Sequence, residues 1–439
     1  MTVSTYSAKH KRDSMSDLSV EISRIRASSL ARNAGWMLAG QGTNLVLQAG
    51  YFILLARLLG VTQYGIFAGA LAFVTLATPF SALGSGLLFV RYVSSDVANF
   101  AAYWGNILFA TFGVGVLLTL LLHLIAPHLL NPASASLILL VAVAECIFRQ
   151  LILCMGQVFQ AFEQLHMTAI VGLLTNLFRL VTVAALTVTL HRATAEQWVL
   201  CSLVASISAA FTGGVVVTVR VGLPNIVPSL FVSRLGEGFN FSLAGSTQSI
   251  YNDIDKVMLS HYRMNVANGI YTMAYRIIDI ATIPITALDL AALPRFFRKS
   301  VEGVTSVVEL SARLSRRAAL MGILSSVCLF LAAPLLPEIV GRGFGDTVAA
   351  LRWLCLIPAF RGVHQLTGSA ITGMGLQRYR TAAQFSAAAL NLGLNLWLIP
   401  RYSWVGAAWA SLATDGALGV TNSLIVWRLP ALIQKGAVR

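Results

Sequence analysis

Long apolar stretches alternate with short polar connections along nearly the whole chain. A helix needs about 20 predominantly apolar residues to cross about 30 Å of hydrocarbon, and about twelve stretches meet that length. They lie at residues 35–57, 65–88, 104–126, 135–156, 167–190, 198–219, 239–260, 269–293, 318–337, 348–368, 379–399 and 405–428. The stretches are continuously apolar and lack the alternation of membrane β-strands. The pattern therefore predicts an all-α, polytopic membrane protein.

The composition narrows the class of protein further. Of 439 residues, 57% are hydrophobic and 11% are charged, whereas soluble domains carry roughly 25% charged residues. The net charge of +14 does not indicate a nucleic-acid partner, because the basic residues lie between apolar stretches and not on one arm. The five cysteines lie inside apolar stretches without repeated close spacing, which excludes a disulfide framework and a zinc site. We expect no metal or other cofactor, and no cleaved signal peptide before the first stretch.

The positions of Lys and Arg predict the orientation, because cytoplasmic loops retain these residues. If the N-terminus is cytoplasmic, most of the 31 Lys and Arg residues fall on the cytoplasmic side. The other side receives only Arg57, Arg192, Arg263, Arg342 and Arg401. We therefore expect both termini on the cytoplasmic side.

An internal repeat divides the chain into two halves. Short motifs recur 205 positions further on: Leu38-Ala39-Gly40 as Leu243-Ala244-Gly245, Pro79 with Ala82-Leu83 as Pro284 with Ala287-Leu288, and Ala205-Ser206 as Ala410-Ser411. Six helices per half would bring both halves into the membrane in the same direction, so we expect two lobes related by a pseudo-twofold axis along the membrane normal, with a cavity between them. The predicted division is a basic segment at 1–33, an N-lobe at 34–219, a linker at 220–238, a C-lobe at 239–428 and a tail at 429–439.

Two polar stripes at equivalent places in the repeat are candidates to line that cavity. Each stripe has the i, i+3, i+7 spacing of one helix face. The stripes are Gln41, Asn44 and Gln48 in the first half, and Ser246, Ser249 and Asp253 in the second. Polar groups that face lipid are costly, so the stripes face either a water-filled cavity or neighbouring helices.

Ionisable residues also lie at membrane depth, where an unpaired charge is unfavourable. They are Glu145, Arg179, Asp253, Arg276, Asp279, Arg361 and Asp415. Helical spacing permits the pairs Glu145 with Arg149, Asp253 with Lys256, and Arg276 with Asp279; each pair is either an internal salt bridge or part of a substrate site. Arg179 has no acidic residue within one turn, so it pairs across helices, for instance with Glu145, or faces a cavity that receives an anion. Arg57, Arg91, Lys256, Asp289 and Arg352 lie near the ends of the stretches, where their side chains are expected to reach the headgroups.

Several short motifs carry a resemblance to a known family. They are Asn33-x-x-Trp36, the stretch from Ala56 to Gly60, Tyr64-Gly65, Arg91 and the stretch from Asp255 to Tyr271. The chain resembles the polysaccharide exporters, of the O-antigen-repeat flippase type, in the multidrug/oligosaccharidyl-lipid/polysaccharide flippase superfamily. The resemblance implies a two-lobed carrier in the bacterial inner membrane that turns undecaprenyl-pyrophosphate-linked oligosaccharide from the cytoplasmic to the periplasmic leaflet by alternating access. It also implies that Arg57, Arg91 and Arg276 are candidates to meet the pyrophosphate, and that the polysaccharide polymerase and the chain-length machinery are candidate partners.

Other readings of the sequence stay open. The chain has no phosphate-binding loop motif, so transport is either unpowered or coupled to an ion through Asp253, Glu145 or Asp415. A multidrug or metabolite exporter of the same superfamily would share the helices and the repeat. A polysaccharide polymerase or ligase is disfavoured because such an enzyme would need a sizeable periplasmic loop, so we expect no catalytic residues. The sequence leaves open whether the glycan would serve O-antigen, capsule or exopolysaccharide.

Overall fold

The computed structural model describes the backbone of residues 4–436 and the side chains of residues 39–243, 246, 249–250 and 252–428. Every regular element within this range is helical, which confirms the all-α prediction. Eight of the described helices are long and apolar enough to cross a membrane. They cover Ala39–Val93, Val97–Leu129, Ile138–Ala161, Leu165–Thr189, Ala195–Arg220, Asn265–Glu302, Val304–Val340 and Gln377–Arg428. The count of twelve spans and the cytoplasmic position of both termini stay predictions.

Two of the long helices are bent; one covers a predicted apolar stretch and the beginning of the next, and the other covers two stretches. Helix α1 (Ser4–Ala77) bends at Gly60, where φ is 70° and ψ is 170°. A residue without Cβ adopts a positive φ at little cost, so glycine suits this position. Helix α15 (Gln377–Gly436) bends in the same way at Ser403, where φ is 54° and ψ is −135°.

The predicted division into two lobes stays a prediction, and we use it to group the remaining elements. The N-lobe contains, besides α1, the helices α2 (Ser85–Val93), α3 (Phe100–Leu129), α4 (Pro132–Ala135), α5 (Ile138–Ala142), the π-helix η3 (Val143–Arg149), α6 (Gln150–Ala161), α7 (Leu165–Thr189) and α8 (Ala195–Arg220). The C-lobe contains α9 (Pro228–His261), α10 (Asn265–Glu302), α11 (Val304–Ala332), α12 (Leu336–Val340), α13 (Thr347–Leu354), α14 (Ile357–Gly373) and α15. Helix α9 begins inside the predicted linker, with Pro228 in its first turn, where a missing N–H costs nothing.

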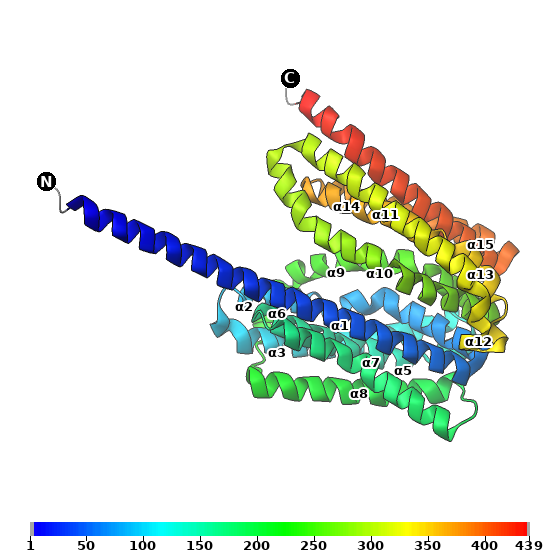
Figure 1. Cartoon of the computed structure of the whole chain (residues 1–439). Coiled ribbons are helices and arrows are strands. Elements are labelled where there is room, and N and C mark those ends of the chain that lie inside the picture. Colours follow the sequence, from blue (N-terminus) through cyan, green and yellow to red (C-terminus); the bar gives the residue numbers. More distant parts are fainter. Residues whose placement is uncertain (1–3, 437–439) are drawn as a thin grey trace.

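The two lobes meet near α12 and α13 and separate toward the end of the molecule where both termini lie (Figure 1). The largest apolar core includes residues of both lobes, among them Tyr64, Ile270 and Phe344. The rings of Tyr64 and Phe344 meet edge to face with their centroids 5.9 Å apart. Burial of this shared apolar surface holds the lobes together at one end.

Two glycines allow α1 and α10 to approach closely at this junction. A Cβ on Gly65 would lie 1.8 Å from the carbonyl oxygen of Asn265, and a Cβ on Gly269 would lie 2.1 Å from the carbonyl oxygen of Val61. The Asn268 amide also donates to the carbonyl of Gly65 at 3.1 Å. A larger residue at either glycine would therefore push the two helices apart.

Arg57 adds a polar contact between the lobes at the same end. From α1, its Nε donates to the carbonyl of Ile339 at 2.6 Å, and its Nη2 donates to the carbonyl of Glu338 at 3.0 Å. These carbonyls belong to α12 of the C-lobe. Arg57 is thus a contact between lobes, in addition to lying near the end of an apolar stretch.

Candidate functional site

A cavity of about 600 Å³ opens between the two lobes. This volume lies within the usual range of ligand-binding sites. Its polar lining includes Asn44, Gln48, Thr75, Glu145, Arg149, Gln150, Gln157, Gln160, Thr168, Thr175, Asn176 and Arg179 from the N-lobe, and Asp253, Lys256, Thr272 and Arg276 from α9 and α10. A second cavity of about 230 Å³ adjoins it in the C-lobe and shares Asp253, Lys256 and Arg276.

On the N-lobe side, one buried carboxylate binds two arginines. Glu145 lies on the π-helix and is 4% exposed. Its Oε2 accepts from Arg149 Nη1 at 3.1 Å, and its Oε1 accepts from Nη2 of Arg179 on α7. Arg179 also donates to Ser206 Oγ at 3.4 Å. The predicted pairs of Glu145 with Arg149 and, across helices, of Glu145 with Arg179 are confirmed. Arg179 also lines the cavity, and whether it meets an anion there stays a prediction.

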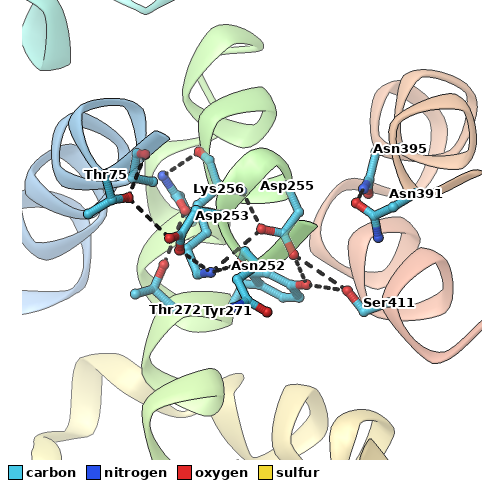
Figure 2. A network of polar contacts seen from close by, with 12 residues as sticks. Thr75, Asn252, Asp253, Asp255, Lys256, Tyr271, Thr272, Asn391, Asn395 and Ser411 are labelled. Carbon is cyan, nitrogen blue, oxygen red and sulfur yellow. Dashed lines mark hydrogen bonds and ion pairs between the residues drawn. The ribbon is translucent and has the colours of Figure 1, made fainter. Parts of the chain in front are cut away.

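On the C-lobe side, Asp253 and Lys256 form the predicted pair. Lys256 Nζ donates to Asp253 Oδ1 at 2.8 Å and to the carbonyl of Asn252 at 2.5 Å. The other oxygen of Asp253 accepts from Thr75 Oγ1 at 3.1 Å, which links α9 to α1 across the lobes (Figure 2). Lys256 is buried, so the expectation that it reaches the headgroups was wrong. The Asp253 carboxylate neutralises the charge of Lys256 within the membrane-spanning part of the helix.

A second carboxylate on α9, Asp255, lies on another face of the helix, and its Oδ1 is 3.7 Å from Lys256 Nζ. Residues two apart on a helix lie on different faces, so Asp255 points toward α15 and not toward α1 (Figure 2). Its Oδ2 accepts from the Tyr271 hydroxyl and lies 3.4 Å from Ser411 Oγ. Sequence reasoning passed over Asp255 as a membrane-depth acid, although its place within the predicted stretch 239–260 was a sufficient signal.

Arg276 reaches the cavity without a carboxylate partner among the described residues. Its guanidinium lies 4.5 Å from the centroid of the Phe52 ring, which belongs to the other lobe, and its Nε has no hydrogen-bond partner in the described structure. The predicted pair with Asp279 is wrong, because Asp279 Oδ1 accepts from Arg361 Nη1 at 2.8 Å instead. Arg276 thus forms no ion pair with a described residue, and its polar partner is the hydroxyl of Tyr64.

Asp415 lies deep in the C-lobe and outside the large cavity. It is 2% exposed, and its Oδ1 lies 3.5 Å from Nε2 of His364. His364, which sequence reasoning did not single out, lines the smaller cavity. Within the described residues, no three His, Cys, Asp or Glu side chains lie together as a metal site would require.

The two polar stripes differ in how they meet the cavity. Asn44 and Gln48 line it, whereas Gln41 is exposed and lies outside its described lining. On α9, Asp253 lines it, but Ser246 and Ser249 do not. Ser246 donates to the carbonyl of Leu243 in its own helix at 2.9 Å. Gln41, Ser246 and Ser249 are thus not part of this described lining, and their role in lining a cavity stays a prediction.

Arg57 and Arg91, the other two cationic candidates, also lie outside the cavity. Arg57 binds the carbonyls of α12, as described above. Arg91 is 61% exposed and pairs with Glu237 of α9, which also accepts from the hydroxyl of Tyr92 at 3.0 Å. In this arrangement both arginines join the lobes and do not line the cavity.

A family model described as polysaccharide biosynthesis protein matches residues 30–300 of the chain, which is more than half of its 439 residues. The chain belongs to this family. The resemblance seen in the short motifs is thereby confirmed at the level of the family. No curated protein matches the sequence significantly.

Solved structures show which fold this family member adopts. An inward-facing multidrug resistance MATE family transporter of the MOP superfamily matches with a TM-score of 0.74 at 13% identity, over 90% of this chain and 95% of its own. An outward-facing one matches with a TM-score of 0.60 at 14% identity, over 93% and 96%. A MOP superfamily transporter from Pyrococcus furiosus, described as having a binding pocket of reversed polarity, matches with a TM-score of 0.63 at 13% identity, over 92% and 96%. The polysaccharide biosynthesis family member therefore has the fold of MOP superfamily transporters.

Proposed function

We propose that this protein flips undecaprenyl-pyrophosphate-linked oligosaccharide from the cytoplasmic to the periplasmic leaflet of the bacterial inner membrane. The product would serve the synthesis of a surface polysaccharide, next to a polymerase and its chain-length machinery. The family match and the transporter fold support a role in transport for polysaccharide biosynthesis. The observation that carries the choice of substrate is Arg276, a membrane-depth arginine without a carboxylate partner in the described cavity.

The chemistry of the cavity suits a ligand with an anionic part and a hydroxyl-rich part. A pyrophosphate cannot cross hydrocarbon bare, and a guanidinium offers it a planar set of donors. Sugar hydroxyls need partners that both donate and accept, and carboxamides do both. The isoprenoid tail would stay in the lipid while the headgroup occupies the cavity.

The conformation suits the first half of such a transport cycle. The lobes separate toward the end that carries both termini (Figure 1), and the TM-score is higher for the inward-facing structure than for the outward-facing one. With both termini in the cytoplasm, as the charge distribution predicts, the cavity would open toward the cytoplasmic leaflet, where lipid-linked oligosaccharides are assembled. Export would then require the contacts at α12 to open.

A multidrug exporter is the second candidate, because the structural neighbours include multidrug transporters. A site for organic cations needs acidic or aromatic groups that are free to bind them. In the described cavity, Glu145 binds two arginines and Asp253 binds Lys256. The guanidinium of Arg276 lies over the Phe52 ring. The rings of Tyr51, Tyr64 and Phe67 also line the cavity, but its described lining holds four basic and two acidic side chains, which favours an anionic substrate over a cationic one.

Coupling to an ion would use one of three carboxylates. Glu145 and Asp253 are held by short contacts to basic side chains, whereas Asp415 has only His364 at 3.5 Å. An ion that binds a carboxylate must displace its present partners. We therefore propose Asp415, with His364 beside it, as the first of the three to test for coupling.

Reconstituted vesicles test the proposed function. An undecaprenyl-pyrophosphate-linked oligosaccharide should move between leaflets faster in proteoliposomes that contain the purified protein than in protein-free vesicles. The rate is measured with an enzyme that is added on one side and modifies only the sugars exposed there. The same vesicles should not accumulate or expel a lipophilic cationic dye. Dye transport without lipid turnover would favour the multidrug exporter and overturn the proposal.

A further inference from the structure

The two walls of the large cavity differ in chemistry. Six carboxamide side chains line it, and all of them belong to the N-lobe: Asn44, Gln48, Gln150, Gln157, Gln160 and Asn176. The C-lobe contributes no carboxamide to the described lining. Its polar groups there are Asp253, Lys256, Thr272 and Arg276. The N-lobe wall thus carries all six amides beside three charged groups, Glu145, Arg149 and Arg179, whereas the C-lobe wall carries three charged groups and no described amide.

Most of these amides keep unused hydrogen-bonding capacity. Gln48, Gln157 and Gln160 make no hydrogen bond with any described residue, although each could make several. Gln150 has only a contact of 3.9 Å to the sulfur of Cys154. Asn44 and Asn176 bond to each other at 2.7 Å and keep further donors and acceptors. Where such an amide is partly buried, as Gln48, Gln150 and Gln157 are, it requires water or a polar ligand in the cavity, whereas Gln160 is exposed near the end of α6.

The glutamines of α6 are placed by local structure. Gln150, Gln157 and Gln160 are spaced i, i+7 and i+10, which brings them to one face of the helix. Gly86 of α2 makes room for the central one, because a Cβ there would lie 1.7 Å from Oε1 of Gln157. A side chain larger than hydrogen at residue 86 would displace the Gln157 amide. The wall therefore has a defined shape and is not a scatter of surface polar groups.

We propose that this amide wall binds the glycan of the substrate, with the pyrophosphate on the opposite side at Arg276. A neutral, hydroxyl-rich ligand makes the best use of amides, which donate and accept in pairs. A phosphate group makes the best use of a guanidinium that has no competing carboxylate. The orientation of the headgroup, and the selectivity for the sugar, follow from this division. The inference rests on the proposed function and adds to it the part of the cavity that recognises the sugar.

The test compares two lipids in the same reconstituted system. One is undecaprenyl pyrophosphate carrying an oligosaccharide, and the other is undecaprenyl pyrophosphate carrying one sugar. Gln157→Leu combined with Gln160→Leu removes two amides of the wall and keeps the side-chain size close. Loss of two hydrogen bonds should slow turnover of the oligosaccharide lipid about ten-fold. Turnover of the one-sugar lipid should change less than about two-fold.

Gln365→Leu provides the matched control, because Gln365 is an amide that lines the smaller cavity of the C-lobe. It should slow both lipids equally or not at all. Thermal unfolding of each variant in detergent checks that the protein is folded, and Gln157→Asn replaces the double variant if the latter unfolds. Equal slowing of both lipids by the amide variants, at wild-type stability, would overturn the inference alone. Failure of the wild-type protein to turn over either lipid would overturn the proposed function, and the inference with it.

Discussion

The N-lobe and the C-lobe hold their charges in different ways. In the N-lobe, Glu145 and Arg179 are 4% and 9% exposed and form a closed group with Arg149 inside one lobe. In the C-lobe, Asp253 is 25% exposed, and it contacts Lys256 on its own helix and Thr75 on the other lobe. The first group is internal, so lobe movement would leave it intact. The second lies at the boundary, so lobe movement would change it.

The largest effect should come from breaking the internal group. Glu145→Gln keeps one acceptor oxygen but removes the negative charge, so Arg179 stays buried without a counter-charge, with Ser206 at 3.4 Å. Removing one partner of a buried pair costs about 3 to 5 kcal/mol. We expect a large drop in the thermal unfolding midpoint in detergent, and recovery of much of it when Arg179→Gln is added. A single variant as stable as the wild type would show that the group is not structural.

The next effect concerns transport and separates the walls of the cavity. Arg276→Gln removes a cation that has no carboxylate partner, so stability should change little, while turnover of a pyrophosphate-linked lipid should fall about ten-fold or more. Arg149→Gln, in the N-lobe, removes a cation that Glu145 already binds, and should slow turnover less. The rates in proteoliposomes, normalised to the amount of folded protein, measure both. A larger effect of Arg149→Gln would place the anion at the N-lobe wall.

A moderate effect is expected at the boundary pair. Asp253→Asn leaves Lys256 buried without its closest carboxylate oxygen, at 2.8 Å, and should lower the free energy of unfolding by about 1 to 3 kcal/mol. The cost is smaller than at Glu145 because Asp253 is partly exposed to the cavity. Adding Lys256→Gln should restore much of the stability and of the transport. If Asp253→Asn is as stable as the wild type and its lipid turnover no longer depends on an ion gradient, Asp253 would instead be assigned to ion coupling.

The smallest effect should be a shift between conformations. Arg57→Gln removes two hydrogen bonds from α1 to the carbonyls of α12, at 2.6 and 3.0 Å. Such exposed bonds contribute about 1 kcal/mol, which corresponds to a shift of several-fold in a two-state equilibrium. Spin labels placed on the two lobes near these residues should report a larger population in which this end is open. An unchanged distance distribution would mean that packing around Gly65 and Gly269 holds this end without Arg57.

Helical spacing predicted two local pairs correctly and a third, Arg276 with Asp279, wrongly. Among the long-range pairs, Arg179 with Glu145 was predicted and Asp279 with Arg361 was not. The pairs of Glu145 with Arg149 and of Asp253 with Lys256 follow from helical spacing, which needs no tertiary information. Asp279 instead pairs with Arg361, 82 residues away, because α10 and α14 pack together. No spacing rule in one sequence predicts such a contact.

The fold class could be predicted from the sequence, whereas the lining of the cavity could not. Continuous apolar stretches predicted an all-α membrane protein, because lipid allows few alternatives. The lining of the cavity depends on tertiary packing, and helical spacing alone did not show that Gln41, Ser246 and Ser249 fall outside its described part. The glutamines at 150, 157 and 160 could have been found by their helical spacing, but only the fold shows that their face meets the cavity.

The central claim is that Arg276 binds the pyrophosphate of a lipid-linked sugar, and a binding measurement tests it most directly. Native mass spectrometry of the purified protein can compare undecaprenyl-pyrophosphate-linked sugar with the same lipid ending in a hydroxyl group. The wild type should prefer the pyrophosphate lipid, and Arg276→Gln should reduce that preference about ten-fold or more. Arg361→Gln serves as the control, because Arg361 is held by Asp279 at 2.8 Å. An unchanged preference in Arg276→Gln would contradict the account.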